Sequence, residues 1–275
     1  MKKFLALVLA SLMVFAFVAC GGTGKDNNGA SDASNASNAS DTSDTTEKET
    51  LVMATNATFP PYEFKEGDSF AGIDVEIAGK IAEKLGMTLE IKDVEFGSII
   101  GGVQTGKFDI GMAGMTVTDE RLKSVNFSDS YATGIQVVIV KEDSAIKSLD
   151  DLKGDGSMKF GVQQDTTGDI YASDTVENGG YGKDNVVRYK TGADAVQALK
   201  TGKVDAVIID NEPAKNFVKA NEGLSILNGD WVKENYAIAI AQDNTELLEK
   251  VNGALKELIA DGTVKAIIDK YIPAE

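Results

Sequence analysis

Apolar residues follow two different spacings along the chain from position 51 onward. Ile73, Ile77, Ile81 and Leu85 recur at the spacing of one helix face, and Gly86 follows them as a typical helix end. Similar patterns predict helices over 97–106, 193–199 and 247–259. Short apolar runs predict strands over 51–54, 87–94, 108–112, 135–140, 160–163, 185–189, 204–209 and 236–241. This alternation predicts an α/β fold, with mostly parallel sheets covered by helices on both faces.

The same order of strands and helices occurs in two halves of the chain. Residues 105–110 read TGKFDI and residues 201–206 read TGKVDA, and in both places a helix ends at glycine just before a strand. We expect one lobe to comprise 50–134 together with 236–275, and the second lobe to comprise 135–235. The chain then crosses between the lobes twice, which predicts a two-strand hinge.

The N-terminal segment has the pattern of an export signal. Lys2 and Lys3 precede an apolar run that reaches Ala19 and is too short for a comfortable membrane span, which predicts a signal peptide over 1–19. An uncleaved N-terminal anchor is the alternative. Cys20 follows directly, and the stretch FVAC resembles a bacterial lipobox, although Phe17 stands where leucine is commonest. We therefore expect Cys20 to be lipidated and to hold the protein on the outer face of the cell membrane.

The residues after Cys20 predict a flexible tether. Positions 21–49 contain no apolar residue larger than alanine, and serine recurs through them. Such a stretch cannot bury enough surface to offset the entropy of ordering, so 20–49 is expected to be disordered. A Gly/Ser-rich chain of this length has a root-mean-square span of roughly 30 Å. We expect the folded part to hang clear of the membrane.

Composition and charge exclude several classes of function. The formal net charge is −16, from 43 acidic and 27 basic residues, whereas nucleic-acid binding needs a basic face. The chain has no histidine and one cysteine, which excludes Ser-His-Asp and Cys-His catalysis, histidine-built zinc sites and disulfides within the chain. We expect no metal, no cofactor and no nucleic-acid partner.

Candidate ligand contacts follow the predicted strands. Ligands of α/β sheets bind at the carboxyl ends of strands, so the residues just after each strand are the first candidates. They supply an amide, aromatic rings, hydroxyls, a guanidinium and a carboxylate, at Asn56, Phe59, Phe96, Thr116, Arg121, Thr166, Thr167 and Asp210. Phe59 and Phe96 could equally be core residues, and Thr167 could cap the helix that follows it.

Arg121 is the most informative of these candidates, because the chain has only two arginines among its 27 basic residues. A guanidinium binds a carboxylate through two parallel hydrogen bonds, which lysine cannot do. The alternative is a surface ion pair with Asp119 or Glu120. The other arginine, Arg188, lies in the predicted strand 185–189 and is expected to face solvent.

Asp210 ends a buried apolar run, where its carboxylate can receive an ammonium group. The alternative is a capping role for the helix predicted from Pro213, because aspartate is favoured at helix N-termini.

Six stretches resemble, in order and spacing, the polar amino-acid-binding proteins of bacterial ABC importers. They are ATNATFPPYEF, GIDVEIAGKIAEKLG, FGSIIGGVQTGKFDIGMAGMTVTDERLKSVNFSDSY, SLDDLKG, GVQQDTTGD and VDAVIIDNEP. The resemblance covers 50–275, and TVTDER followed by NFSD is its most specific part. It implies a type II periplasmic-binding-protein fold, whose two α/β lobes close on one free amino acid. It also implies a membrane permease as partner and a role in binding without catalysis.

The resemblance implies a role for each of nine residues, and Thr166 is a tenth candidate from its place after the strand 160–163. Arg121 looks like the ligand of the α-carboxylate, and Asp210 looks like the partner of the α-ammonium group. The other positions supply hydroxyls, a backbone contact, a stacking pair of rings and two amides facing the ligand side chain: Thr116 and Thr167; Gly114; Phe59 and Phe96; Asn56 and Gln163.

Two departures from the family pattern affect the site. Asn56 stands where several members carry aspartate, and Asp165 replaces the usual glycine of a QGTTG loop. The amides of Asn56 and Gln163 mildly favour a ligand with a neutral polar side chain, but the sequence does not identify the amino acid.

An enzyme similar to cyclohexadienyl dehydratases is the alternative on the same fold. It needs a general acid near the leaving group, and Asp165 or Glu120 would have to serve. A sensing module is a third possibility, which we do not expect for this chain.

Overall fold

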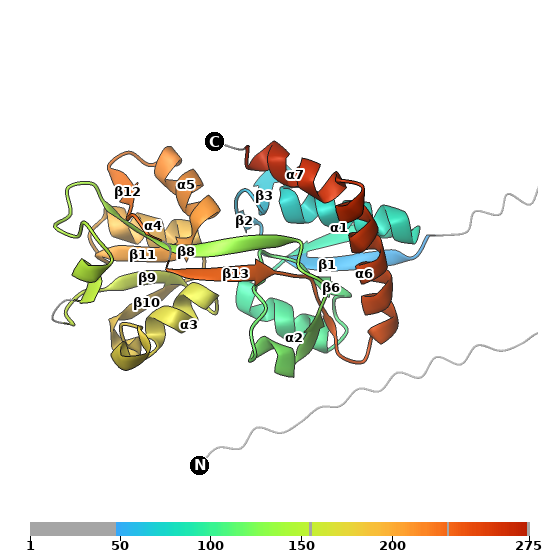
Figure 1. Cartoon of the computed structure of the whole chain (residues 1–275), viewed down its shortest axis with the longest axis horizontal. Helices are drawn as coiled ribbons and strands as arrows, with labels where there is room; N and C mark the ends of the chain where they lie inside the picture. The colour runs from blue at the N-terminus through green and yellow to red at the C-terminus, as the bar shows by residue number, and fades with distance from the viewer. Residues whose placement is uncertain (1–47, 154–155, 230, 274–275) are drawn as a thin grey trace, which may run out of the picture. The chain divides into compact units, whose positions relative to one another are not determined.

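The fold was analysed in a computed structural model, which describes residues 48–153, 156–229 and 231–273 (Figure 1). Cys20, the predicted signal peptide 1–19 and all but the last two residues of the tether 20–49 lie outside the described residues. Residues 46–275 form one compact unit.

The first sheet has five strands, four from the N-terminal part of this unit and one, β14, from near its C-terminal end. Its order is β5 (Thr88–Asp93), β1 (Thr50–Thr55), β6 (Ile110–Gly111), β14 (Ala239–Ala241) and β7 (Val125–Phe127). β1 is parallel to β5 and β6, whereas β14 is antiparallel to β6 and β7. Alternate residues of β1 enter different cores: Met53 packs with α1 (Ile73–Leu85), α6 (Thr245–Ala260) and α7 (Thr263–Tyr271), and Ala54 packs with α2 (Ile99–Gln104). Helices therefore cover both faces.

The second sheet has the order β10 (Val186–Tyr189), β9 (Phe160–Gln163), β11 (Ala206–Asp210), β8 (Ala132–Lys141) and β12 (Leu224–Ile226). β9 is parallel to β10 and β11, and β8 is antiparallel to its neighbours. Buried side chains of α4 (Gly192–Lys200) and α5 (Asn211–Ala220) share one core with Val207 and Ile209 of β11. Ala172 of α3 (Thr167–Ser173) shares the other core with Ala206 and Ile208.

Two strands carry the chain between the sheets. β8 pairs antiparallel with β13 (Val232–Tyr236), and Figure 1 shows this pair running from one sheet towards the other. After Tyr236 the chain enters β14 of the first sheet. The two-lobed type II fold with two hinge crossings is thus confirmed.

The structure differs from the predicted elements in several places. The sheets are mixed rather than mostly parallel, because β7, β8 and β14 run antiparallel to their neighbours. The run 236–241 is divided between β13 and β14 because the chain changes sheets there. The strands β7 and β12 and the helix α7 were not predicted. The segment 56–64, for which no strand was predicted, contributes β2 (Thr58–Phe59) and part of β3 (Glu63–Glu66), which form a small antiparallel sheet with β4 (Ser69–Ala71). Short 3-10 helices occupy Phe96–Ser98, Arg121–Lys123, Asp150–Lys153, Val176–Asn178 and Lys183–Asn185.

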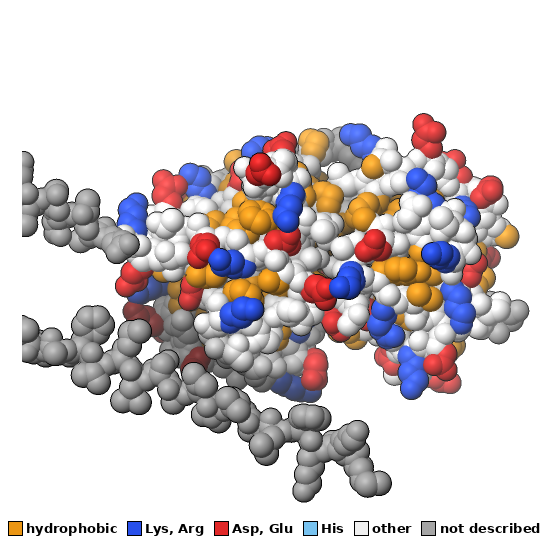
Figure 2. Space-filling view, turned by 180° about the vertical axis from the view of Figure 1, so that it is seen from behind, with side chains coloured by type: hydrophobic (Ala, Val, Ile, Leu, Met, Phe, Trp, Pro, Cys, Tyr) orange, Lys and Arg blue, Asp and Glu red, His pale blue; other side chains and the backbone are white. Residues whose placement is uncertain are grey.

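The surface is charged and mixed. Figure 2 shows acidic and basic side chains interspersed on the face seen from behind. Ion pairs link helices of the first lobe: Lys84 Nζ of α1 lies 2.9 Å from Glu257 Oε2 of α6, and Lys270 of α7 pairs with Glu76 of α1. Over the part of the chain that the structure describes, no helix combines the length and apolar character needed to cross a membrane.

Candidate functional site

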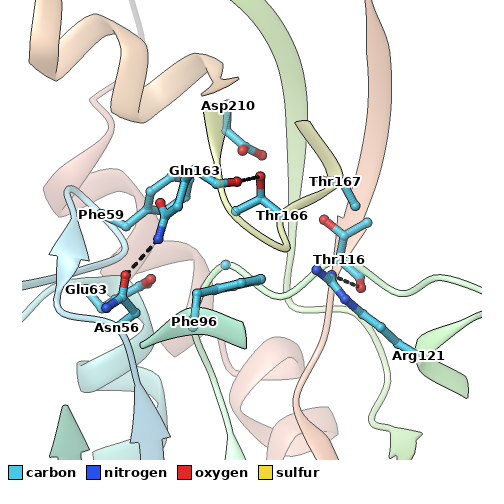
Figure 3. A pocket seen from close by; sticks show the side chains of 12 residues that line it. Asn56, Phe59, Glu63, Phe96, Thr116, Arg121, Gln163, Thr166, Thr167 and Asp210 are labelled. Atoms are coloured by element: carbon cyan, nitrogen blue, oxygen red, sulfur yellow. Dashed lines mark hydrogen bonds between the residues drawn. The ribbon is translucent and has the colours of Figure 1, made fainter. Parts of the chain in front are cut away.

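A narrow cavity lies where the two lobes meet, and its walls come from both of them (Figure 3). All ten residues predicted from the sequence line it: Asn56, Phe59, Phe96, Gly114, Thr116 and Arg121 from the first lobe, and Gln163, Thr166, Thr167 and Asp210 from the second. Glu63 and Ala113 line it as well and were not predicted.

Strand ends explain why these residues converge. Asn56 directly follows β1, Gly114 lies shortly after β6, Thr166 follows β9, and Asp210 is the last residue of β11. Parallel strands present their carboxyl ends at the same edge of a sheet, so each lobe directs one set of side chains into the cavity.

Arg121 lies inside the molecule, with 8% of its surface exposed. Its Nη1 donates to the carbonyl oxygen of Thr116 at 2.7 Å, and its Nη2 donates to that of Asp165, in the other lobe, at 3.2 Å. The guanidinium lies 5.3 Å from the Phe96 ring centroid. The alternative of a surface ion pair between Arg121 and Glu120 is wrong, because Glu120 pairs with Lys123. Burial lowers the pKa of Arg121, although Glu234 and Asp210 oppose that effect.

Asp210 is buried at the start of α5, but its side chain makes no capping hydrogen bond, so the helix-cap alternative is wrong. The carboxylate accepts a hydrogen bond from the Tyr236 hydroxyl instead. Burial, together with the nearby Glu234 carboxylate, raises the pKa of Asp210 to about 7. Glu234, which was not predicted, lies on hinge strand β13.

The two threonines that line the cavity from the second lobe make different hydrogen bonds. The capping role considered for Thr167 belongs to Thr166, whose Oγ1 accepts from the Asp169 N–H at 3.3 Å. The Thr166 hydroxyl also donates to the Gln163 carbonyl oxygen at 2.8 Å. Thr167 is buried, and its Oγ1 accepts from Gln136 Nε2 at 3.4 Å.

A hydrogen bond between two amides joins the lobes at the opposite end of the cavity from Arg121 (Figure 3). Gln163 Nε2 donates to Asn56 Oδ1 at 2.8 Å, and Asn56 Nδ2 donates to the Val94 carbonyl oxygen at 2.8 Å. Gln163 Oε1 is buried and has no hydrogen-bond partner among the described residues. This oxygen is therefore available to a donor group on a ligand side chain.

A buried carboxyl pair lies beneath the first-lobe wall. Glu63, on β3, is joined by a side-chain hydrogen bond to Asp74, on α1. Asp74 accepts from the Gly114 N–H at 2.7 Å and from the Tyr131 hydroxyl at 2.8 Å. Burial raises the pKa of Asp74 to about 6 and raises that of Glu63 well above its usual range. The N–H of Gly114 is thus already used within the protein.

The loop after β9 accommodates Asp165 at the position where the family usually has glycine. This residue has φ +63°, a conformation that favours glycine, which explains why glycine is usual there. Its side chain is exposed and does not line the cavity. Arg188 supports the same loop rather than simply facing solvent, because its Nε lies 2.8 Å from Asp169 Oδ2, which also accepts from the Asp165 N–H at 3.1 Å.

The site offers no evident metal centre. Among the described residues, no group of three or more histidine, cysteine, aspartate or glutamate side chains could hold a metal ion.

Comparison with known proteins adds three findings. A family model for bacterial extracellular solute-binding proteins, family 3, matches residues 51–274. An arginine-binding extracellular protein of Bacillus subtilis (strain 168) is 34% identical over 278 residues, and the match covers 100% of both chains. Solved structures of an ancestral arginine-binding protein, one bound to arginine and one to glutamine, are each 41% identical; each match has a TM-score of 0.74 and covers 82% of this chain and 99% of the other.

Proposed function

The chain belongs to the family 3 bacterial extracellular solute-binding proteins, and from this premise we propose that it captures a polar amino acid between its lobes and delivers it to the permease of an ABC importer. Proteins of this family act outside the cytoplasm. The names of the similar proteins support an amino acid as ligand, because arginine and glutamine occur among them.

The observation that carries the proposal is the presence of two opposite charges, on different lobes, in one small cavity. Arg121 binds the α-carboxylate of the amino acid through paired N–H groups, assisted by the hydroxyls of Thr116 and Thr167. Asp210 receives the α-ammonium group. A zwitterion satisfies both charges at once, whereas a simple anion or cation satisfies only one.

The remaining walls suit the ligand side chain. The rings of Phe59 and Phe96 flank it, and the amides of Asn56 and Gln163 face its polar end. Because the contacts come from both lobes, they are complete only when the lobes are closed. Ligand binding therefore shifts the protein toward its closed form, which is the form presented to the permease.

A thermal-shift screen against the twenty amino acids tests the proposal. An amino acid at 100 times its Kd stabilises the folded protein by about 3 kcal/mol, which raises Tm by roughly 5–10 °C in a protein of this size. Arg121→Ala is expected to abolish this shift, whereas Lys123→Ala, which removes an exposed basic residue nearby, is expected to retain it. A shift that survives in Arg121→Ala would contradict the proposed site.

We also propose that Cys20 anchors the protein by its lipid to the outer face of the membrane. Cys20→Ala is expected to move the protein from the membrane fraction into the soluble extracellular fraction while leaving amino-acid binding unchanged. Cys20→Ala protein that stays in the membrane fraction would favour an uncleaved N-terminal anchor.

The two acids considered for the enzymatic alternative do not line the cavity, although the carboxyl groups of Glu63 and Asp210 do. Asp165 and Glu120, the acids that the enzymatic alternative would need, are both exposed and are not among the lining residues. Turnover of a prephenate-like substrate by the purified protein would establish the enzymatic alternative.

A further inference from the structure

Hinge strand β13 brings a second carboxyl group against the proposed ammonium site. Glu234 is 5% exposed and Asp210 is 6% exposed, so both are buried. They belong to strands on opposite sides of β8: in the register of the sheet, Gln136 of β8 is paired with Asp210 of β11 on one side and with Val232 of β13 on the other. Glu234, two residues beyond Val232, lies on the same face of β13.

Side-chain contacts link the two carboxyl groups. Gln136 Nε2 donates to Glu234 Oε2 at 2.9 Å, and both Gln136 and Glu234 lie close enough to Asp210 to influence its pKa. The Tyr236 hydroxyl donates to Asp210. Glu234 Oε1 is buried and receives no hydrogen bond from a fixed donor among the described residues. The Tyr171 hydroxyl also lies against Glu234, and a proton on either carboxyl group can serve as a further donor between them.

Glycine at position 134 makes this network possible. A side chain there would collide with the Tyr236 hydroxyl, which occupies the space beside the Gly134 backbone. The hydroxyl can therefore pass over β8 and reach Asp210.

The groups that surround the pair provide little positive charge. Arg121 faces it from the first lobe, and the other titratable groups that act on it or on its neighbours are Tyr62, Glu63, Asp74, Asp165, Tyr171, Glu212 and Tyr236. Burial raises the pKa of each of the three tyrosines, so they stay neutral near pH 7. Two buried carboxylates side by side repel each other, and holding one proton relieves that repulsion.

We propose that Glu234 is a positioning residue that keeps a proton on the Asp210–Glu234 pair, and that the arriving α-ammonium group displaces this proton into solvent. The proposal rests on the proposed function, because it requires an amino acid bound at Asp210.

The step balances in atoms and charge. The O–H bond of the protonated carboxyl group breaks, its proton goes to solvent, and the ammonium group keeps all its own hydrogens while it donates to the new carboxylate. Capture of one zwitterion therefore releases up to one proton.

The size of the effect follows from the pKa of Asp210. With a value of about 7, roughly a tenth of the groups are ionised at pH 6 and roughly nine tenths at pH 8. The bound state needs the ionised form, so affinity is expected to be roughly tenfold higher at pH 8 than at pH 6.

Isothermal titration calorimetry in buffers of different ionisation enthalpy measures the released protons directly. The probe is L-glutamine or L-arginine, whichever gives the larger thermal shift. Intact protein is expected to release close to one proton at pH 6 and much less than half a proton at pH 8. Glu234→Gln keeps the size of the side chain and removes its charge, so it is expected to release fewer protons at pH 6 than the intact protein and to show a weaker pH dependence of affinity. Glu90→Gln, on exposed strand β5, is the matched control and is expected to behave as the unsubstituted protein.

The outcomes separate this proposal from the proposed function. Binding without proton release at pH 6 in the unsubstituted protein overturns the proton exchange, even if Glu234→Gln fails to fold. A Glu234→Gln protein that binds and still releases a full proton overturns the role of Glu234. Absence of binding by all twenty amino acids overturns the proposed function itself.

Discussion

Two buried carboxyl pairs lie in the part of the molecule that the structure describes, and they differ in the groups that hold them. In the first lobe, Asp74 of the Glu63–Asp74 pair accepts from a backbone N–H, that of Gly114, and from Tyr131. In the Asp210–Glu234 pair, the fixed donors are side chains, those of Tyr236 and Gln136, and the pair bridges a strand of the second sheet and the hinge. The first pair fixes a wall of the cavity, whereas the second is placed to exchange its proton for a ligand group.

Removing Asp74 from the first pair is expected to have the largest effect, and this effect is a loss of stability. Asp74→Ala leaves the Gly114 N–H and the Tyr131 hydroxyl without their acceptor in a buried place. We expect a loss of about 3 kcal/mol in the free energy of unfolding. Urea denaturation measures it, with Asp68→Ala, an exposed aspartate, as control. A loss below about 1 kcal/mol would show that Asp74 is not needed to hold the wall.

Removing the charge of the second pair is expected to affect binding instead. Asp210→Asn keeps an oxygen for the Tyr236 hydroxyl but loses the charge that attracts an ammonium group. We expect affinity to fall about 100-fold, while the free energy of unfolding changes by less than about 1 kcal/mol. Calorimetry and urea denaturation measure the two quantities, and Asp68→Asn is the control. A fall of less than tenfold would argue against Asp210 as the ammonium partner.

The two pairs are also expected to titrate in different pH ranges. The pKa values of Asp74 and Asp210 are raised from 3.8 to about 6 and about 7, so the folded protein holds these protons more tightly than the unfolded chain. The stabilisation that these two protons give the folded protein is fully present below about pH 4, and it is lost as the pH rises through 6 and 7.

Without added amino acid, the free energy of unfolding is therefore expected to fall by an amount on the order of 2 kcal/mol between pH 6 and pH 8. In Asp210→Asn the fall should end near pH 7, where Asp74 has lost nearly all of its proton. A curve that rises over this range, or that Asp210→Asn leaves unchanged, would contradict the assignment.

Substituting one tyrosine beside each pair is expected to give the smallest effects, and it separates the two pairs most selectively. Tyr131→Phe removes one donor to Asp74, and Tyr236→Phe removes one donor to Asp210. Each is expected to cost about 1 kcal/mol of stability. Only Tyr236→Phe should weaken binding at pH 7, by about threefold, because its hydrogen bond lowers the pKa of Asp210. Equal affinities in the two variants would remove the distinction between the pairs.

Local sequence patterns predicted much of the fold because the main strands are short apolar runs. The run 160–163 coincides with β9, and the helical stripe from Ile73 to Leu85 coincides with α1. The division of 236–241 between two sheets was not predictable, because the apolar pattern continues while the chain changes partners. The small β2–β4 sheet was missed because its strands are two to four residues long.

Sequence reasoning named ten of the twelve residues that line the cavity: strand ends pointed to eight of them, and the family resemblance added Gly114 and Gln163. Glu63 and Glu234 were missed for a physical reason. Glu234 lies between Lys233 and Asn235, both exposed, and its burial comes from the pairing of β13 with β8, about a hundred residues earlier in the chain. Local sequence contains no sign of that pairing, nor of the partner that makes a buried glutamate tolerable.

Gly134 gives the hinge a further property. Because the Tyr236 hydroxyl fills the space that a side chain at 134 would take, any substitution there displaces the donor that helps to keep Asp210 ionised. A residue that does not line the cavity thereby becomes a means of tuning affinity. Natural or selected variants with altered uptake are accordingly expected to include changes at this position, where a map of ligand contacts alone would not place them.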